Sequence, residues 1–536
     1  MLTWLVIVPV LTAIFIYLFP FEKIGKIIVI LTQIMLTGFA FYIFLSCKEA
    51  EITARIGNFS GVLGITLRAD TLSSVFILFT TFVFLCAFIY TFNENYSRLF
   101  GLLLFIWEGL LIGIFLTCDI FNLFVLSEVA AVVVAILIMY IRDKRSMYDG
   151  MVYLLVNTIA IQFYLFGVGY IYKLTGVLDM ESVTQAIKEI DKKSLVLPYA
   201  LIITSVSLKC ALMPLFSWLP KAHGTPGAPS AVSAILSGLH IKSGIYLFIR
   251  FQDIFSCFAT QEFFLVLGII TGIIGFIFAL SQSDIKLILA YHTISQIGMI
   301  MIGLNIPDIY SFTGGVYHIF NHAFFKSTLF LCAGIIANVY GTRDIYQIRG
   351  VLKKMPLVGA ASIMAVLGIT GAPLFNGSIS KYFIMSGTNW LVTAAMIFIN
   401  LGTIVSFIKF SSILFGSDKS EIILKPQRKI KIDKWQQASV LILGSLCLIG
   451  GIFGRQFIEF LFNVSVNVEA AGYLEKVIIF AVSAGIGYLI YRYYVINSKL
   501  FKKIRSLEMG FRTICVSIGL FFAVILVVTN LVFPLK

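Results

Sequence analysis

The sequence predicts an all-α polytopic membrane protein, and three observations lead to that prediction. The chain has 536 residues, of which 59% are hydrophobic and only 12% are charged, whereas soluble domains carry roughly 25% charged residues. Apolar runs of about 20 residues, the length that crosses a bilayer as a helix, recur along the whole chain, and the mean hydropathy is +0.99. These runs are continuous instead of alternating, which excludes a barrel of membrane-spanning strands.

We predict sixteen membrane spans joined by short loops. No loop has room for a soluble nucleotide-binding domain, and the phosphate-binding pattern GxxxxGK[ST] does not occur, so we exclude ATP as the direct driver. The predicted spans lie near residues 2–20, 24–46, 70–93, 98–117, 119–141, 148–172, 196–219, 229–249, 260–281, 285–305, 311–339, 355–388, 390–415, 435–463, 472–491 and 508–534.

The net charge of +14 reflects membrane topology and gives no reason to expect nucleic-acid binding. Most lysines and arginines fall in loops that follow odd-numbered spans. Loops rich in lysine and arginine face the cytoplasm in polytopic proteins. Both termini are therefore predicted to lie outside the cytoplasm. The first span lacks a basic region before it and a small-residue cleavage site, so we expect no cleavable signal peptide. Eight scattered cysteines without a CxxC pattern predict no disulfide framework, no metal site and no bound cofactor.

Two of the spans are interrupted by proline and glycine. The seventh reads LKCALMPLFSWLPKAHGTPGAP and contains Pro214 and Pro220, and the twelfth reads LGITGAPLFNGSISKYF and contains Gly371, Pro373 and Gly377. Proline removes a backbone hydrogen bond, and such breaks are tolerated at membrane depth only where the freed backbone is buried in protein or lines a cavity. Paired breaks of this kind are typical of transporters built from inverted repeats.

The two breaks align two halves of five spans each. Lys209 lies just before the first break and Lys381 just after the second. Because each half has an odd number of spans, the halves are predicted to have opposite orientations in the membrane. The predicted organisation is N-terminal helices over 1–95, a first five-helix repeat over 96–252, a second over 258–416, and a basic cytoplasmic loop with C-terminal helices over 417–536.

Ionisable side chains inside the spans are the strongest functional signal. A charge at the bilayer centre costs about 2.5–3.5 kcal/mol on insertion scales, so such residues are functional candidates by default. We predict an ion or proton path through them. The path candidates are Glu128, Lys209, Lys242, His292, His318, His322, Lys326 and Lys381, with Glu108, His240 and Lys409 as possible additions.

Glu128, near the middle of the fifth span, is the expected partner of Lys209. Burial favours a neutral lysine and a nearby carboxylate favours a charged one, so a change in their separation would make Lys209 take up or release a proton. The alternative is a static ion pair that fixes helix packing.

His318, His322 and Lys326 recur at every fourth position and form one stripe on the eleventh span. Histidine titrates near neutrality and can relay protons through its two ring nitrogens. The histidine pair could in principle bind a metal, but no carboxylate or cysteine nearby completes a ligand set. His292 adds a polar step in the tenth span, beside Gln296.

Other polar positions leave their roles open. Lys242 is the better relay candidate of the eighth span, and His240, two residues away, faces a different direction and is more typical of a packing histidine. Glu108 and Lys409 could serve the path or pair with neighbours. Asp119 could cap a helix, and His223 could mark the mouth of an access path or order its loop.

Five stretches in order carry a resemblance to a known family. They are LKCALMPLFSWLPKAHGTPGAPSAVSAILSGLHIKSGIYLFIR, SDIKLILAYHTISQIGMI, GVYHIFNHAFFKSTLFLCAG, GTRDIYQIRGVLKKMP and GAPLFNGSISKYF. Over residues 95–415 the chain resembles the antiporter-like, proton-conducting subunits of complex I. The same family includes Mrp-type multi-subunit cation/proton antiporters and energy-converting membrane hydrogenases such as formate hydrogenlyase.

The resemblance implies a fold and a set of site residues. It implies a core of fourteen helices with breaks in helices seven and twelve, to which this chain adds two C-terminal helices. It also implies that Glu128, Lys209, Lys242 and Lys381 carry the conduction path, and that His292, His318 and His322 join the halves. Position 292 departs from the family, which often has serine there, and Glu108 lies outside the family pattern.

The first functional hypothesis is a proton- or sodium-translocating subunit of an energy-converting complex, a membrane-bound hydrogenase or a complex I-like oxidoreductase. Redox chemistry would then belong to peripheral partner subunits, and this chain would have no catalytic residue. The second is a subunit of a Mrp-type sodium/proton antiporter, and the third an independent proton-coupled solute carrier. The expected location is a prokaryotic inner (cytoplasmic) membrane, with other membrane subunits and lipid as partners and no nucleic acid.

Overall fold

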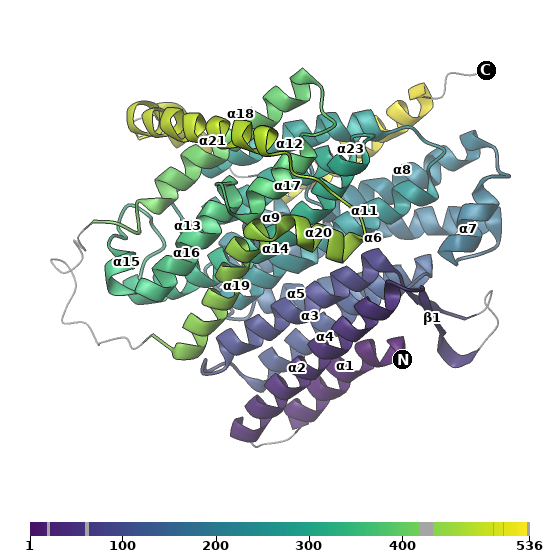
Figure 1. Cartoon of the computed structure of the whole chain (residues 1–536). Coiled ribbons are helices and arrows are strands. Elements are labelled where there is room, and N and C mark those ends of the chain that lie inside the picture. The colour runs from purple at the N-terminus through teal and green to yellow at the C-terminus, as the bar shows by residue number, and fades with distance from the viewer. Residues whose placement is uncertain (19–21, 59–63, 417–431, 497, 508, 533–536) are drawn as a thin grey trace.

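The computed structural model describes residues 1–18, 22–58, 64–416, 432–496, 498–507 and 509–532, most of which lie in the helices of one bundle (Figure 1). Within this part of the chain, thirteen helices are long and apolar enough to cross a membrane. The all-α polytopic fold is confirmed. Most of the predicted basic loop, residues 417–431, lies outside the described residues.

The N-terminal part and the first half of the bundle follow the predicted order of spans. The helices of the N-terminal part are α1 (Leu2–Leu18), α2 (Glu22–Cys47) and α3 (Thr71–Thr91). Those of the first half are α4 (Arg98–Leu116), α5 (Ile120–Ile138), α6 (Lys144–Thr175), α7 (Met180–Ile187), α8 (Lys192–Lys209), α9 (Trp218–Gly224), α10 (Ser230–Ile235), the π-helical η2 (Leu236–His240) and α11 (Ile241–Ile254).

The second half and the C-terminal part continue the same order. The second half comprises α12 (Gln261–Ser281), α13 (Ile285–Leu304), α14 (Ile309–Tyr340), α15 (Val351–Lys354), α16 (Pro356–Thr370), α17 (Asn376–Ile384) and α18 (Trp390–Ser411). The C-terminal part comprises α19 (Lys434–Ile452), α20 (Gly454–Phe462), α21 (Ala470–Ile490), the π-helical η4 (Tyr491–Val495), α22 (Lys499–Arg505) and α23 (Phe511–Val532).

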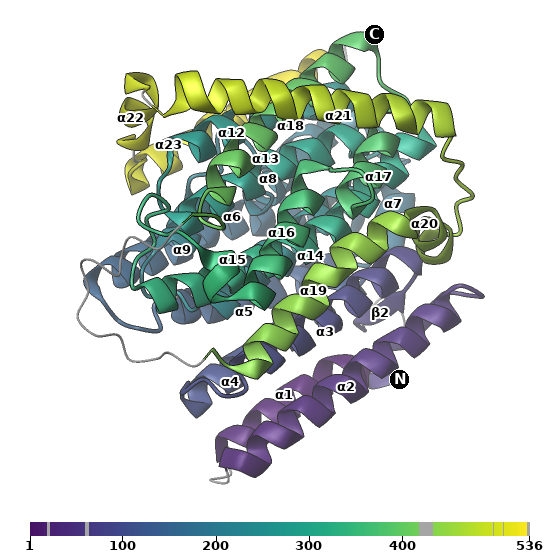
Figure 2. The same ribbon diagram turned by 60° about the vertical axis from the view of Figure 1, so that its left-hand side comes forward.

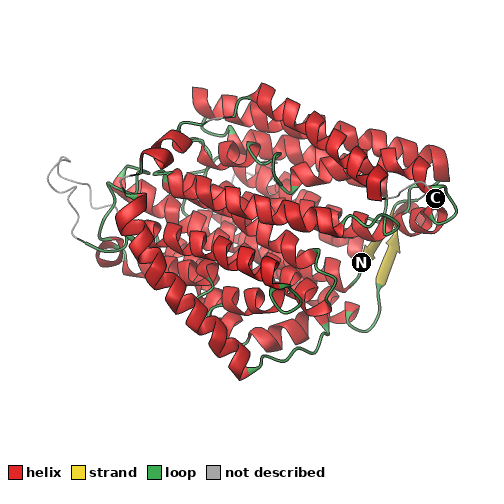
Figure 3. Cartoon of the chain, turned by 90° about the horizontal axis from the view of Figure 1, so that it is seen from above, coloured by secondary structure: helices red, strands yellow, loops and turns green. Residues whose placement is uncertain are grey.

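A short β-hairpin, which the sequence analysis does not predict, joins α2 to α3. Strands β1 (Ile52–Arg55) and β2 (Thr66–Ala69) pair antiparallel, with Ile52 opposite Ala69. The hairpin lies at one edge of the bundle (Figure 3). Its four-residue strands are too short to cross a membrane, so the fold class is unchanged.

At the first break, between α8 and α9, side chains satisfy the freed backbone groups. The Met213 N–H donates to the Thr271 hydroxyl at 3.1 Å, and the Trp218 indole N–H donates to the Leu208 carbonyl oxygen at 3.0 Å. Thr271 belongs to α12, in the other half. The break is therefore buried in protein, as membrane depth requires.

The second break, between α16 and α17, is satisfied in a similar way. Gly371 ends α16 with a φ of +76°, a conformation that suits glycine. The Lys381 ammonium donates to the Ile369 carbonyl oxygen at 2.7 Å, and the Leu374 N–H donates to the Tyr473 hydroxyl of α21 at 3.1 Å.

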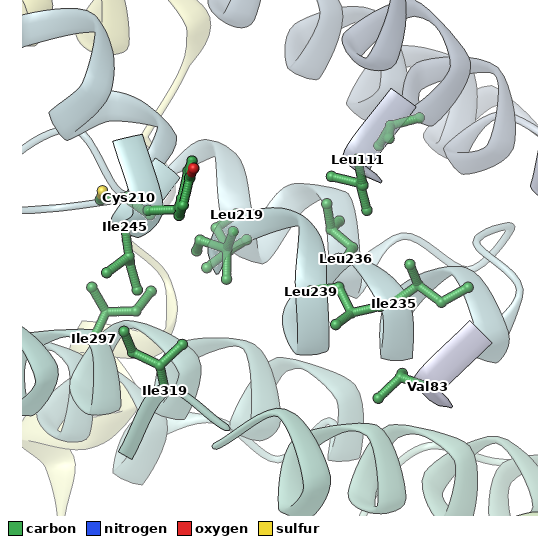
Figure 4. Packing of buried hydrophobic residues seen from close by; sticks show 14 of the residues in the cluster. Val83, Leu111, Cys210, Leu219, Ile235, Leu236, Leu239, Ile245, Ile297 and Ile319 are labelled. Carbon is green, nitrogen blue, oxygen red and sulfur yellow. The ribbon is translucent and has the colours of Figure 1, made fainter. Parts of the chain in front are cut away.

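The two halves meet along a seam of buried apolar side chains. Figure 4 shows Ile245 of α11 next to Ile297 of α13, and Ile319 of α14 below them. All three are fully or almost fully buried. Polar residues at the interface are thus embedded in an apolar surround, where unpaired polar groups are costly.

An ion pair ties α11 to the start of α3. Asp70 caps α3 by accepting a hydrogen bond from the Ser73 N–H, and the Arg250 guanidinium donates to its carboxylate at 2.5 Å. Burial alone would raise the pKa of Asp70, but the Arg250 charge and the cap hydrogen bonds outweigh it and hold that pKa below its usual value. Sequence analysis missed this pair, because Asp70 and Arg250 are far apart in the chain.

Glu108 joins the N-terminal helices to the first half. It lies in α4, fully buried, and its carboxyl accepts a hydrogen bond from the Gln33 side-chain amide of α2. One oxygen of each side chain has no hydrogen-bond partner among the described residues. A protonated carboxyl can donate to the Gln33 amide oxygen and satisfy both, whereas a carboxylate cannot. We therefore infer that Glu108 carries a proton.

Replacing Glu108 tests this assignment. We expect Glu108→Gln, which keeps two reciprocal hydrogen bonds, to leave the free energy of unfolding within about 0.5 kcal/mol of wild type. Glu108→Ala leaves the Gln33 amide without its hydrogen-bond partner and should lower the free energy of unfolding by about 1–3 kcal/mol. Thermal unfolding of the purified protein measures both. Equal destabilisation by the two variants would show that the carboxylate form is required.

Candidate functional site

Glu128 and Lys209 come from α5 and α8, but the structure does not join them. The Glu128 carboxylate accepts a hydrogen bond from the Thr158 hydroxyl of α6 at 3.3 Å. Among the described residues, Lys209 makes no ion pair or hydrogen bond through its ammonium, although Glu128 acts on it electrostatically. The static ion pair is therefore not formed in this conformation.

Close packing holds the backbone of Lys209 in place. Lys209 is the last residue of α8, and α11 crosses it at Gly244. A Cβ atom at position 244 would lie 2.9 Å from the Cβ of Lys209, so only glycine allows this approach. The close approach fixes the point from which the Lys209 side chain extends.

His240 is held between two aromatic side chains. The Trp107 indole N–H donates to His240 Nδ1 at 3.2 Å, and the Tyr153 hydroxyl lies 3.1 Å from Nε2. Because indole can only donate, Nδ1 carries no proton and Nε2 must carry one. Protonation at Nδ1 would break the Trp107 bond. This geometry is that of a packing histidine.

Lys242 and His322 lie in direct contact at the centre of the bundle. The Lys242 ammonium donates to His322 Nδ1 and to the Ser237 carbonyl oxygen. Ser237 belongs to η2, a single π-helical turn, and such turns occur frequently at functional sites. The sequence analysis names both residues, and the structure shows that α11 and α14 bring them together.

His318 continues this line toward the second break. One ring nitrogen lies 2.8 Å from the Ser380 hydroxyl of α17, and the other lies 3.1 Å from the Gln296 side-chain oxygen of α13. Ser380 is the residue before Lys381. Ser380 was missed in the sequence analysis because hydroxyl side chains are ordinary in membrane helices, where they often bond their own backbone.

Three further buried groups surround this line. The Lys326 ammonium donates to the Leu289 carbonyl oxygen, and the His292 ring packs on Phe407, with centroids 4.7 Å apart. The His223 ring stacks on Phe330, also at 4.7 Å. Neither histidine has a hydrogen-bond partner among the described residues. His223 is fully buried, so it lies inside the bundle and not at its loop surface.

Lys381 lies at the other end of the line, in a cavity of about 50 Å³ that has room for a few water molecules. Its ammonium donates to the Ile369 carbonyl oxygen and to the Asn400 side-chain oxygen, each at 2.7 Å. Asn400 is a second residue that the sequence analysis missed, because a lone amide in an apolar span gives no distinctive signal.

Lys409 has a different environment. Its ammonium donates to the carbonyl oxygens of Leu280 at 2.7 Å and Gln282 at 2.6 Å, at the C-terminal end of α12. The Arg505 guanidinium of α22 donates to the neighbouring Ser281 carbonyl oxygen at 2.7 Å. The last carbonyls of a helix need donors, and cations are favoured there. Lys409 thus caps a helix.

Asp119, at the membrane boundary, is also a cap. Its carboxylate accepts a hydrogen bond from the Asn122 N–H at 2.6 Å and begins α5. Burial raises the pKa of Asp119, and the hydrogen bonds from the α5 N–H groups oppose that rise. The geometry agrees with the helix cap that the sequence analysis names as a role for Asp119.

A family model and individual relatives among known proteins agree on the family to which the chain is similar. Residues 117–408 match the family model of the NADH:quinone oxidoreductase/Mrp antiporter transmembrane proteins. The chain is 28% identical over 469 residues to a Na⁺/H⁺ antiporter subunit of Alkalihalophilus pseudofirmus, covering 83% of this chain and 94% of that protein. It is 30% identical over 416 residues to a putative antiporter subunit of Staphylococcus saprophyticus, covering 75% and 81%.

Solved structures share the fold. A chain of the Mrp complex from a Dietzia species superposes with a TM-score of 0.79 at 23% identity, covering 89% of this chain and 99% of that one. A chain of an archaeal membrane-bound sulfane sulfur reductase superposes with a TM-score of 0.76 at 23% identity, covering 90% and 99%. The chain belongs to the NADH:quinone oxidoreductase/Mrp antiporter family of antiporter-like membrane subunits.

Proposed function

We propose that this chain is the proton-carrying antiporter-like subunit of a Mrp-type multi-subunit sodium/proton antiporter. The observation that carries the proposal is the polar line in the bundle centre, from Lys242 through His322 and His318 to Ser380 beside Lys381. The relative from Alkalihalophilus is one subunit of a Na⁺/H⁺ antiporter, which favours this function over the hydrogenase placed first by sequence analysis.

The proposed path starts at Lys209 and ends at Lys381. Approach of Glu128 favours the charged form of Lys209, and separation favours release of its proton toward Lys242. Lys242 can pass a proton to His322 Nδ1, with which it is already in contact, while His322 gives up the proton on Nε2. His318 and Ser380 then bring the path to Lys381.

Water is required between some of these groups. His322 Nε2 is buried with no hydrogen-bond partner among the described residues, and the same holds for both nitrogens of His292. Ordered water commonly satisfies such polar groups in protein interiors. In the proposed path, His292 and Lys326 line this hydrated part, while Lys409, His240 and Glu108 serve structure.

The second candidate is an ion-translocating subunit of a membrane-bound redox complex. We consider it because the chain shares its fold with a chain of the archaeal sulfane sulfur reductase. The path would be the same, but peripheral redox subunits would drive it. Because the identity is 23%, this likeness supports the fold alone.

Partner identity and transport decide between the two candidates. We expect affinity purification of the tagged chain, expressed with its neighbouring genes, to recover other membrane subunits and no iron–sulfur or nickel–iron protein, as mass spectrometry would detect. Everted vesicles holding this complex should lose an imposed proton gradient when Na⁺ is added. Recovery of a redox subunit, with no response to Na⁺, would favour the second candidate.

Replacing Lys209 tests the start of the path. Lys209→Met removes the titrating group but keeps the apolar stem, so we expect Na⁺-dependent proton movement to fall at least about tenfold, the effect of about 1.4 kcal/mol. The measurement is the initial rate per assembled complex in everted vesicles. The control is Lys353→Met, since Lys353 is an exposed residue of the short helix α15. An undiminished rate in Lys209→Met would remove this residue from the path.

The same substitution at two buried histidines distinguishes a histidine that relays protons from one that only packs. We expect His322→Gln to reduce the transport rate at least about tenfold, because glutamine forms hydrogen bonds but cannot relay a proton in this way. His240→Gln should lower thermal stability through the bonds to Trp107 and Tyr153 while keeping the rate per assembled complex within about twofold. Equal rates in the two variants would refute the distinction.

A further inference from the structure

Helix α21 forms one wall of the cavity that holds Lys381. It runs along the outside of the bundle over α18 (Figure 2), and it lies beyond the residues that match the family model. From α21, Tyr473, Lys476 and Phe480 line the cavity, together with Lys381 and Asn400. A helix beyond the residues matched by the family model thus completes the surroundings of a proposed path residue.

Tyr473 attaches α21 to the broken helix. Its hydroxyl accepts a hydrogen bond from the Leu374 N–H and lies 3.1 Å from the Ser378 hydroxyl. Leu374 has a φ of +68°, a left-handed conformation that is strained for leucine and persists only where the surroundings hold it. The hydrogen bond from Leu374 to Tyr473 supplies such a restraint in the segment that precedes Lys381.

The basic side chains in the described cavity lining are two lysines. They are Lys381 and Lys476, and the described lining contains no carboxylate. Glu475 lies 3.7 Å from the Lys476 ammonium, but its side chain is 67% exposed while that of Lys476 is 24% exposed. The carboxylate is therefore on the outer side, and the ammonium is on the inner side. Lining of one sign repels ions of that sign.

Lipid contact alone does not explain a lysine at this position. Most of α21 faces outward, since only 11% of the apolar stretch within residues 470–495 is buried in the protein. A helix that merely fills space against lipid has no need of an ammonium turned inward, where a charge is costly. The tyrosine bonds and the inward lysine occur on the same face of α21, one turn apart.

We propose that α21 forms part of the ion outlet next to Lys381. Tyr473 positions the broken helix, and the charge of Lys476 keeps metal cations and returning protons away from Lys381. The inference rests on the proposed function and assigns two residues to it that lie beyond the residues matched by the family model. Tyr473 is a positioning residue, and Lys476 sets selectivity at the outlet.

The experiment uses the whole complex in everted vesicles, with subunit content checked by purification. The variants are Lys476→Met, Lys476→Arg and Tyr473→Phe, and the matched control is Lys499→Met, an exposed lysine of α22. Two rates are recorded, the decay of an imposed pH gradient without Na⁺ and the Na⁺-dependent proton movement. The second gives a maximal rate and a half-saturating Na⁺ concentration.

We expect Lys476→Met to speed the decay without Na⁺ several-fold, because the repelling charge is gone. Lys476→Arg and Lys499→Met should decay like wild type. Tyr473→Phe keeps the ring packed on Tyr382 but loses both hydroxyl contacts, so the maximal rate should fall about fivefold at an unchanged half-saturating Na⁺ concentration.

If the pH gradient decays at the wild-type rate in Lys476→Met, the role of Lys476 is overturned. If it decays equally fast in Lys476→Met and Lys476→Arg, packing and not charge explains the effect, and the role is overturned as well. A normal maximal rate in Tyr473→Phe would overturn its positioning role. In both cases the wild-type complex still exchanges Na⁺ for protons, so the proposed function stands. A wild-type complex without Na⁺-dependent proton movement would overturn the proposed function, and this inference with it.

Discussion

Ammonium groups in the bundle interior need oxygen acceptors, and this requirement explains much of the structure. An uninterrupted helix uses its carbonyl oxygens internally, so free ones occur at ends, breaks and π-helical turns. Lys242 binds a carbonyl in η2, Lys381 binds one at the second break, and Lys409 binds those at the end of α12. Helix irregularities thus supply acceptors for these three lysines, whereas Lys326 uses the Leu289 carbonyl oxygen inside α13.

Neutral acceptors suit a path better than carboxylates do. A carboxylate in a low-dielectric interior would hold an ammonium charged, whereas a carbonyl stabilises the charge less and lets the proton leave more easily. Among the proposed path lysines in the described part of the chain, Lys209 alone is influenced by a carboxylate, that of Glu128, and the two are not in contact. In the proposed mechanism, control of protonation is thus concentrated at Lys209, and the later groups respond to it.

The sequence analysis predicted the fold correctly and named most residues of the candidate site, because both depend on local patterns. Long apolar runs predicted the helices, proline and glycine predicted both breaks, and lone lysines in apolar runs marked the interior. It did not find Gln33, Ser380 or Asn400, since single polar uncharged residues are tolerated in membrane helices and give no signal. It named Lys209 as the partner of Glu128, whereas Thr158 makes the contact in this conformation.

The sequence by itself determined which residues enter the membrane, where two helices must break and which charges are buried, because burial and backbone constraints act on each segment alone. Only the tertiary structure decided which buried groups touch. It paired Lys242 with His322, gave His240 two aromatic partners and used Lys409 as a helix cap. These contacts join helices far apart in the chain, and their geometry depends on how the helices pack, which no local pattern records.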